Sequence, residues 1–396
     1  MSKWKEYKLG DICEVVRGGS PRPIIDYITE DEDGVNWLKI GDVKETDKYF
    51  TFANEKIKPS GIAKSREVTS GDIILSNSMS FGRAFITLID GYIHDGWLRI
   101  RCSEEVLDKE YLYYFLTSSL AQNQFKAVAN GSVVNNLKSD TVKAVSIDLP
   151  PLDEQKRISS ILSIIDEKIN NNNHINDNLE QQAEIYFYYL FIDNPDPSWQ
   201  KGTIGDIGTV VGGSTPSKAK PEYYTDNGIA WITPKDLSID KSKFISHGAD
   251  DITELGLKNS SASIMPTGTV LFSSRAPIGY IAIADGEVTT NQGFKSVVPK
   301  NNVGTAFVYY FLKNALPTIE NMASGSTFKE ISGSAMRTVP VMIPDDESLQ
   351  KFADYCEPLF QQQRTLETEN RSLVSLRDSL LPKLMSGELD VSDIDI

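Results

Sequence analysis

The chain has 396 residues, of which 40% are hydrophobic and 24% charged, as in a soluble globular protein with room for two or three domains. No apolar run approaches the roughly 18 residues of a membrane span and the N-terminus MSKWKEYKLG is not a signal peptide, so we expect a cytoplasmic protein. The cysteines Cys13, Cys102 and Cys356 are scattered, which indicates neither a disulfide framework nor a zinc site.

The net charge of −15 is unevenly distributed along the chain. Residues 1–150 carry −3 and residues 199–344 carry +1, whereas residues 151–198 carry −6 and residues 345–396 carry −7. The acidic segments suit a protein partner better than a phosphate backbone, and each near-neutral segment can hold a local basic face.

The sequence repeats itself with a period of about 195 residues. The matching pairs are Trp4 and Trp199, GDI at 10–12 and 205–207, GGS at 18–20 and 212–214, WLKIGDV at 37–43 and WITPKDL at 231–237, GDIILS at 71–76 and GTVLFS at 268–273, GS at 131–132 and 325–326, and LP at 149–150 and IP at 343–344. Each copy predicts a mixed α/β unit with many short strands, for example at 72–76 and 270–273, and with helices at 109–128 and 306–322. The tyrosines that begin these two helices fit core packing.

A long helix is predicted after the first copy, at 152–190, where 39 residues contain neither proline nor glycine. Its apolar positions recur at spacings of four and three, which favours one long partner helix and a length of about 58 Å. The seam consists of Ile158, Leu162, Ile165, Ile169, Asn172, Asn176, Leu179, Ala183, Tyr186 and Leu190.

A second long helix follows the second copy and is expected to stop at Pro382. Its seam consists of Phe352, Tyr355, Leu359, Gln362, Leu366, Glu369, Leu373, Leu376 and Leu380. We expect the two helices to pair antiparallel, with Ile158 opposite Leu380 and Asn176 opposite Gln362. The alternative is two amphipathic helices that lie on separate cores.

The sequence contains no Walker phosphate loop, no dinucleotide-binding glycine fingerprint and no adenine-methyltransferase stretch such as Asn-Pro-Pro-Tyr, so we expect neither catalysis nor a cofactor. His94, His174 and His247 stand apart from any metal-ligand spacing, so no metal site is expected either.

Polar glycine loops occur at equivalent places in both copies, at 15–22 and 211–218. Backbone N–H groups, hydroxyls and cations suit phosphate oxygens, although a simple tight turn explains each loop alone. Arg275 suits a guanine edge, and Asn291 and Gln292 suit an adenine edge.

Seven stretches carry a family resemblance that covers nearly the whole chain: LPPLDEQKRI at 149–158, GGSTPS at 212–217, WITPKD at 231–236, VLFSSRAPIG at 270–279, NQGF at 291–294, SGSTF at 324–328 and LRDSLLPKLMSGELDV at 376–391. Together they resemble the specificity subunits of Type I restriction-modification systems, the HsdS family.

The resemblance implies an α+β fold with a pseudo-two-fold internal repeat, in which two long antiparallel helices form a coiled coil and separate two similar mixed α/β target recognition domains. The expected segments are recognition domain 1 at 1–150, spacer helix 1 at 151–192, recognition domain 2 at 193–344, spacer helix 2 at 345–385 and a tail at 386–396.

In that family each recognition domain reads one half of a bipartite double-stranded DNA target. The helices set the gap and bind two modification subunits, which carry S-adenosylmethionine and methylate adenine, and restriction subunits can join. The resemblance thus implies a DNA-binding protein that is not itself an enzyme. The expected DNA-binding residues are Arg17, Gly18, Gly19, Ser20, Arg22, Lys39, Ser76, Asn77, Arg83, Gly131, Ser132, Gly213, Ser214, Thr215, Lys218, Lys235, Ser273, Ser274, Arg275, Asn291, Gln292, Gly325, Ser326 and Thr327. The expected partner-binding residues are Leu152, Gln155, Ile158, Leu373 and Leu380.

The first copy departs from the pattern, because Ser76-Asn77-Ser78 stands where the second has Ser273-Ser274-Arg275, and His94-Asp95 stands where it has Asn291-Gln292. The two half-sites are therefore expected to differ. The competing interpretations are a coiled-coil scaffold that binds no DNA, and a cryptic nuclease or methyltransferase.

Overall fold

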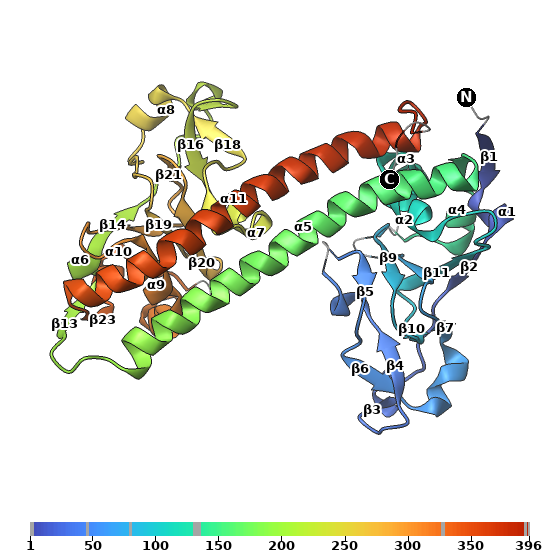
Figure 1. Ribbon diagram of the computed structural model, residues 1–396, viewed down its shortest axis with the longest axis horizontal. Helices are drawn as coiled ribbons and strands as arrows, with labels where there is room; N and C mark the ends of the chain where they lie inside the picture. Colours follow the sequence, from blue (N-terminus) through green and yellow to red (C-terminus); the bar gives the residue numbers. More distant parts are fainter. Residues whose placement is uncertain are drawn as a thin grey trace. The chain divides into compact units, whose positions relative to one another are not determined.

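The computed structural model describes residues 4–44, 47–78, 81–129, 136–325, 329–391 and 394, without the side chains of 128 and 129. The chain forms two compact units, residues 1–169 with 372–396 and residues 170–371. Each of the two long helices contributes to both units (Figure 1), so this division differs from the predicted segments, whose boundaries follow the helix ends. Within the described residues, none of the helices is both long and apolar enough to cross a membrane.

The first unit is built on a five-stranded sheet whose first and last strands in the sequence are neighbours. Its strand order is β2 (Cys13–Arg17), β11 (Trp97–Cys102), β8 (Ile73–Ser76), β9 (Ala84–Thr87) and β5 (Tyr49–Phe50). A second five-stranded sheet has the order β3 (Ile28–Thr29), β6 (Glu55–Ile57), β4 (Val35–Leu38), β10 (Gly91–Ile93) and β7 (Arg66–Val68), and β1 (Lys5–Lys8) pairs with β12 (Ser146–Leu149).

The second unit repeats this topology. Its five-stranded sheet has the order β14 (Gly208–Gly212), β22 (Lys295–Pro299), β19 (Val270–Ser274), β20 (Ile278–Ala284) and β17 (Phe244–Ile245). The other sheet has the order β15 (Tyr224–Thr225), β18 (Asp250–Ile252), β16 (Ile229–Ile232) and β21 (Thr289–Thr290), and β13 (Gln200–Thr203) pairs with β23 (Pro340–Ile343). In each large sheet one edge strand is parallel to its neighbour: β5 to β9 in the first unit and β17 to β20 in the second. The predicted internal repeat is therefore confirmed in the large sheets, while the second sheet of the first unit has one further edge strand, β7.

Short helices complete each unit. The first unit has α1 (Leu9–Ile12), α2 (Lys109–Thr117), α3 (Ser119–Ala129) and α4 (Ser139–Lys143), with 3₁₀ turns at Ile24–Asp26, Ile40–Asp42 and Pro59–Lys64. The second has α6 (Ile204–Ile207), α7 (Pro234–Ile239), α8 (Glu254–Lys258), α9 (Thr305–Met322) and α10 (Gly333–Arg337), with a 3₁₀ turn at Pro221–Tyr223. The helix predicted at 109–128 is thus two helices, because the backbone is extended at Ser118. As predicted, the tyrosines that begin α2 and α9 pack into the cores.

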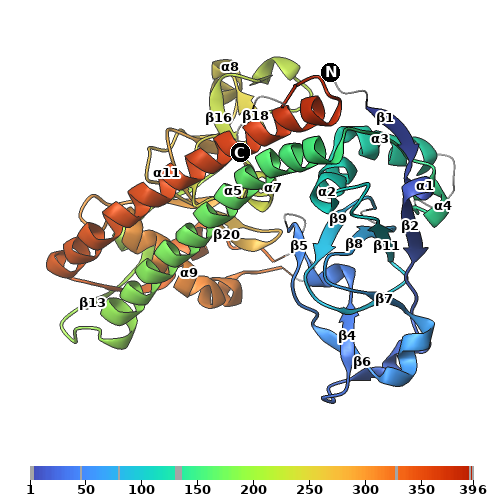
Figure 2. The same cartoon turned by 45° about the vertical axis from the view of Figure 1, so that its right-hand side comes forward.

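The long helices are α5 (Leu152–Phe187), continued by a π-helical turn at Tyr188–Asp193, and α11 (Asp346–Met385). They run side by side (Figures 1 and 2), and within each unit their contacts are antiparallel. In the first unit Asp166 accepts a hydrogen bond from Arg377, and in the second the ring of Tyr186 lies 6.0 Å from that of Phe352, measured between centroids. All ten predicted seam residues of α5 are buried or half-buried, which confirms the seam.

The predicted seam of α11 is partly wrong. Tyr355, Gln362 and Leu376 are exposed, whereas Cys356, Phe360 and Gln363 are buried. For Tyr355 and Gln362 the reason is that this part of α11 packs on the core of the second unit as well as on α5, which shifts the buried face by one residue. The register is also shifted, since the Asn176 carbonyl accepts a hydrogen bond from Gln363, and the buried amide of Asn172 bonds Glu369 and Asn370.

Pro382 does not end α11, which runs three residues further to Met385. A proline so close to a helix end costs little helix stability, because few intrahelical hydrogen bonds remain to be made beyond it. Leu384 and Met385 are fully or almost fully buried in the core of the first unit, and this packing keeps the last turn helical.

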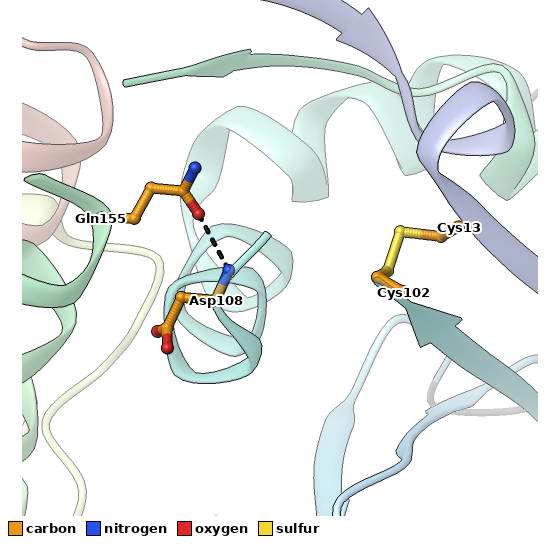
Figure 3. The surroundings of a disulfide bond; sticks show 4 residues. All are labelled: Cys13, Cys102, Asp108 and Gln155. Carbon is orange, nitrogen blue, oxygen red and sulfur yellow. Dashed lines mark hydrogen bonds between the residues drawn. A yellow bond between two sulfur atoms is a disulfide. The ribbon is translucent and has the colours of Figure 1, made fainter. Parts of the chain in front are cut away.

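Cys13 and Cys102 form a disulfide, with their Cα atoms 4.2 Å apart (Figure 3). This corrects the expectation drawn from the cysteine spacing. The two residues are 89 positions apart in the sequence but directly opposite each other in the antiparallel pair β2–β11. The strand register, and not the spacing along the chain, makes them neighbours. Cys356 is free and buried.

Candidate nucleic-acid interface

Both units hold a glycine loop at the end of the first strand of the large sheet. Gly18 follows β2, and a Cβ there would lie 2.1 Å from the carbonyl oxygen of His94. Gly213 follows β14, and a Cβ there would lie 2.0 Å from the carbonyl oxygen of Asn291. Only glycine allows this approach. Each loop is therefore held against the segment that precedes β11 in the first unit and β22 in the second.

The residue two positions after each of these glycines donates a hydroxyl hydrogen bond to that same segment. Ser20 donates to Asp95 over 2.8 Å, and Thr215 donates to Gln292. Gly18 is therefore the structural equivalent of Gly213, one residue away from the pairing suggested by the GGS repeat. The two sites share one geometry but carry an anion in the first unit and a neutral amide in the second.

Asp95 connects the predicted loop residues of the first unit. Its carboxylate accepts hydrogen bonds from Ser20 and, over 3.3 Å, from Arg22, and its backbone carbonyl accepts from Arg17 and Asn77. Burial alone would raise the pKa of Asp95, but the hydrogen bond from Ser20 and the other polar contacts outweigh it and lower the pKa. The carboxylate is therefore ionised, and Asp95 holds two exposed arginines at one edge of the unit, Arg22 through its carboxylate and Arg17 through its backbone carbonyl.

An open pocket of about 830 Å³ lies beside this cluster. Its lining includes Ser20, Arg22 and Lys39 from the predicted set, together with the exposed apolar residues Ile24 and Ile25. Lys39 forms an ion pair with Glu55 at the same pocket. Sequence reasoning missed Asp95 and the two isoleucines, although the repeat had aligned Asp95 with Gln292.

In the second unit, Glu330 gathers the cations near Gln292. It lies 3.5 Å from Arg275 and 3.4 Å from Lys295, measured between the charged atoms. The Lys295 ammonium also contacts the carbonyl of Gln292 and the hydroxyl of Ser274. Glu330 therefore orients the guanidinium of Arg275, while part of the Arg275 side chain stays exposed. Sequence reasoning missed Lys295 and Glu330, which no motif marked.

Four predicted DNA-binding side chains are buried, and direct base contact through them is not supported. Ser76, Ser273 and Ser274 are fully buried and Asn77 almost so. Their polar atoms hold the loops: Ser273 donates to the carbonyl of Pro277, Ser274 to that of Gly293, and Ser76 accepts from the amide of Arg83. These residues shape the loops from inside each unit.

The other predicted residues occupy varied positions. Lys218 and Lys235 are exposed, Gly19, Ser214 and Arg83 are half-buried, Asn291 accepts a hydrogen bond from the amide of Gly293, and Gly325 has a positive φ of 122°. Gly131, Ser132, Ser326 and Thr327 lie outside the described residues.

The predicted partner-binding residues are mostly engaged inside the first unit. Gln155 is 1% exposed, and its amide bonds the Asp108 N–H over 2.9 Å (Figure 3) and the carbonyls of Val106 and Pro150. Ile158 is fully buried and Leu380 packs against the same core, while Leu152 and Leu373 are half-buried. A partner contact through Gln155 or Ile158 is therefore not supported.

Known DNA specificity proteins resemble this chain over most of its length. Residues 1–181 and 197–374 match the family model described as the Type I restriction modification DNA specificity domain. The HindI specificity subunit of Haemophilus influenzae is 23% identical over 98% of this chain and 100% of its own length. The MjaIX specificity subunit of Methanocaldococcus jannaschii is 45% identical over 157 residues, which are 39% of this chain and 36% of that subunit.

A solved structure shares the fold. The crystal structure of the Type I restriction-modification system S subunit from M. genitalium has a TM-score of 0.57 and 19% identity, and the match covers 97% of this chain and 96% of that one. The two matched segments coincide with the two copies of the internal repeat. The chain therefore belongs to the Type I restriction modification DNA specificity family.

Proposed function

We propose that this chain is the DNA-recognition subunit of a Type I restriction-modification complex, and that each unit reads one half of a bipartite duplex target. The observation that carries this proposal is the repeated loop cluster, in which one geometry presents Asp95 in one unit and Gln292 in the other. Two units with the same loop geometry but different polar groups at the loop suit two half-sites that differ in sequence. A scaffold protein without DNA binding has no comparable support.

We propose the division of labour that the family resemblance implies. Two modification subunits carry the methyl donor and the chemistry, and restriction subunits can join them, whereas this chain supplies DNA contacts and no catalysis. The acidic long helices, with the exposed Ile164 on α5, are the proposed docking surface for those partners. The functional segments remain those proposed from the sequence, at 1–150, 151–192, 193–344, 345–385 and 386–396, and the site of action is the cytoplasm, without a membrane.

The arginine and lysine of the second unit provide a test of base reading. Arg275→Ala should cost about 1–3 kcal/mol on the specific duplex and relax one half-site only, because a guanidinium held by Glu330 can present a fixed pair of donors to a base. Lys218→Ala should weaken binding to specific and random duplexes alike and lower the slope of log affinity against log salt by about 0.9, because an exposed lysine contacts phosphate.

The measurement is titration of the complex with both duplexes at several salt concentrations. Lys258→Ala is the matched control, since Lys258 is exposed in the same unit and paired with Glu254 on α8. Equal losses on specific and random duplexes for both Arg275→Ala and Lys218→Ala would show that Arg275 does not read a base.

A further inference from the structure

Each unit contains one buried lysine at an equivalent position of its large sheet. Lys48 immediately precedes β5 and Lys243 immediately precedes β17, the edge strands that are parallel to β9 and β20. Their backbone carbonyls accept hydrogen bonds from Ile86 and Ile283 respectively. The side chains are only 7% and 5% exposed. Lysine is almost never buried without a specific set of partners, so a buried lysine at the same position in both units indicates a shared role.

The Lys243 ammonium joins the edge strand to three helices. It forms an ion pair with Glu180 of α5, donates to Gln363 of α11 over 2.7 Å and donates to Tyr310 of α9 over 3.0 Å. The ring of Phe360 on α11 lies 4.2 Å away, measured to the centroid, which is a cation–π distance. Burial opposes ionisation of both partners and lowers the pKa of Lys243, whereas the neighbouring Lys243 and Lys313 outweigh burial at Glu180 and lower the pKa of its carboxyl.

The backbone of the same strand is also fixed to α11. The carboxylate of Glu367, 8% exposed, accepts the amide hydrogens of Lys243 over 2.8 Å and of Phe244 over 3.1 Å. Arg364, three residues earlier on α11, pairs with Asp285 at the end of β20. The edge of the sheet is therefore fixed to α11 by directional bonds.

Lys48 makes the corresponding connection in the first unit. Its ammonium contacts the hydroxyl of Tyr114 on α2 over 3.0 Å, that of Ser163 on α5 over 3.1 Å, and the carboxylate of Glu110 over 2.5 Å. Tyr114 in turn donates to Asp166 of α5 over 2.6 Å, and Asp166 accepts from Arg377 of α11 over 3.0 Å. A lysine and a tyrosine thus link sheet and long helices in both units, although their helix partners differ.

Apolar contacts alone would hold a sheet on a helix without fixing its position, because hydrophobic burial has no direction. A buried ion pair adds little net stability, since desolvation offsets most of the attraction, but its hydrogen bonds are satisfied in one arrangement only. Directional bonds at the strand nearest the helices therefore determine where the recognition loops lie relative to those helices.

We propose that Lys48 and Lys243 are positioning residues that lock each recognition unit in place on the long helices and so make the complex strict about the gap between half-sites. This inference rests on the proposed function. The lysines touch no DNA; they act through the placement of the sheet that bears the loops. Loosening one of them should leave both half-site sequences unchanged and should broaden the range of gaps that the complex accepts.

The test uses the full complex with its modification subunits and a panel of duplexes that carry the established half-sites at gaps from two base pairs too short to two too long. Lys243→Met and Lys48→Met each remove an ammonium and keep an apolar stem of similar length. For each, the preference for the correct gap over gaps one base pair off should fall by about tenfold, which corresponds to about 1.4 kcal/mol. The exposed Lys258→Met should leave the preference unchanged.

A ratio between gaps separates positioning from stability, because a variant that merely folds less well loses binding at every gap equally. Tyr310→Phe provides a milder variant in case Lys243→Met does not fold, since it removes one hydroxyl partner of Lys243 and Glu180 and keeps the ring. It should reduce the ratio by about threefold, as the loss of one buried hydrogen bond would.

An unchanged ratio in the folded variants would overturn the inference while leaving the proposed function intact. A wild-type complex that binds all gaps equally would instead overturn the proposed function, and with it the inference.

Discussion

A heptad inserted into both long helices, after Ile169 in α5 and after Arg371 in α11, should lengthen the gap between the recognised half-sites by about three base pairs. Seven helical residues add about 10 Å, and a base pair occupies about 3.4 Å along the duplex. The insertion preserves the seam of α5, in which Asn172 bonds Glu369 and Asn370. The half-site sequences should stay the same, because the loops that carry Asp95 and Gln292 are untouched.

Affinity should fall even at the new gap. Three added base pairs rotate the far half-site by about 100° on a turn of about 10.5 base pairs, whereas a heptad rotates paired helices little. Bending or twisting of the DNA has to absorb this difference. The measurement is the methylated motif of a host that carries the double insertion, and an insertion in one helix alone is the control, since it breaks the pairing. Retained methylation with an unchanged gap would show that the helices do not set the spacing.

Phe352→Ala should destabilise the second unit by about 3–5 kcal/mol, the usual loss for a fully buried phenylalanine. Phe352 of α11 has no exposed surface, and its ring lies 5.3 Å from Phe191, 5.8 Å from Phe187 and 5.9 Å from Tyr310, measured between centroids. The substitution removes the ring that connects α5, α9 and α11, and neighbours held by two other helices cannot close the cavity.

Tyr355→Ala on the same helix is the matched control, because Tyr355 is a predicted seam residue of the same unit but is 38% exposed, so it should lose less than Phe352→Ala. The free energy of opening is measured by native-state hydrogen exchange at the amides of α9, which reports the second unit separately from the first. Equal losses for the two variants would mean that the predicted seam, in which both residues were equivalent, describes α11 better than the buried face found here.

The sequence was sufficient for the architecture because the internal repeat and the spacing of apolar residues in α5 are properties of the chain itself. It was insufficient for α11, whose buried face depends on where the core of the second unit lies and therefore on Cys356 and Phe360 as much as on the seam. Pro382 was read as a helix end because the anchoring of Leu384 and Met385 in a core is a tertiary effect.

The candidate site was predictable in its loops but not in its connections. Arg17, Ser20 and Arg22 belong to the predicted set. Asp95 does not, although the repeat aligns it with Gln292, because its contact with all three depends on the pairing of β2 with β11. Ser273 and Ser274 could not be distinguished from the neighbouring Arg275, because alternation along a strand does not show which polar side chain bonds a loop. The Cys13–Cys102 bond depends on the same strand register.

We propose that the two units of one chain select two separate DNA sequences, and the set of methylated sites in a host that carries the intact system tests this most directly. We expect one motif made of two short, different half-sites with a fixed gap of unspecified sequence between them. A chain in which residues 199–344 are replaced by those of a relative should change one half of that motif and leave the other half and the gap as they were. Methylation at one uninterrupted sequence, or a change in both halves on that replacement, would show that the two units do not read separate half-sites.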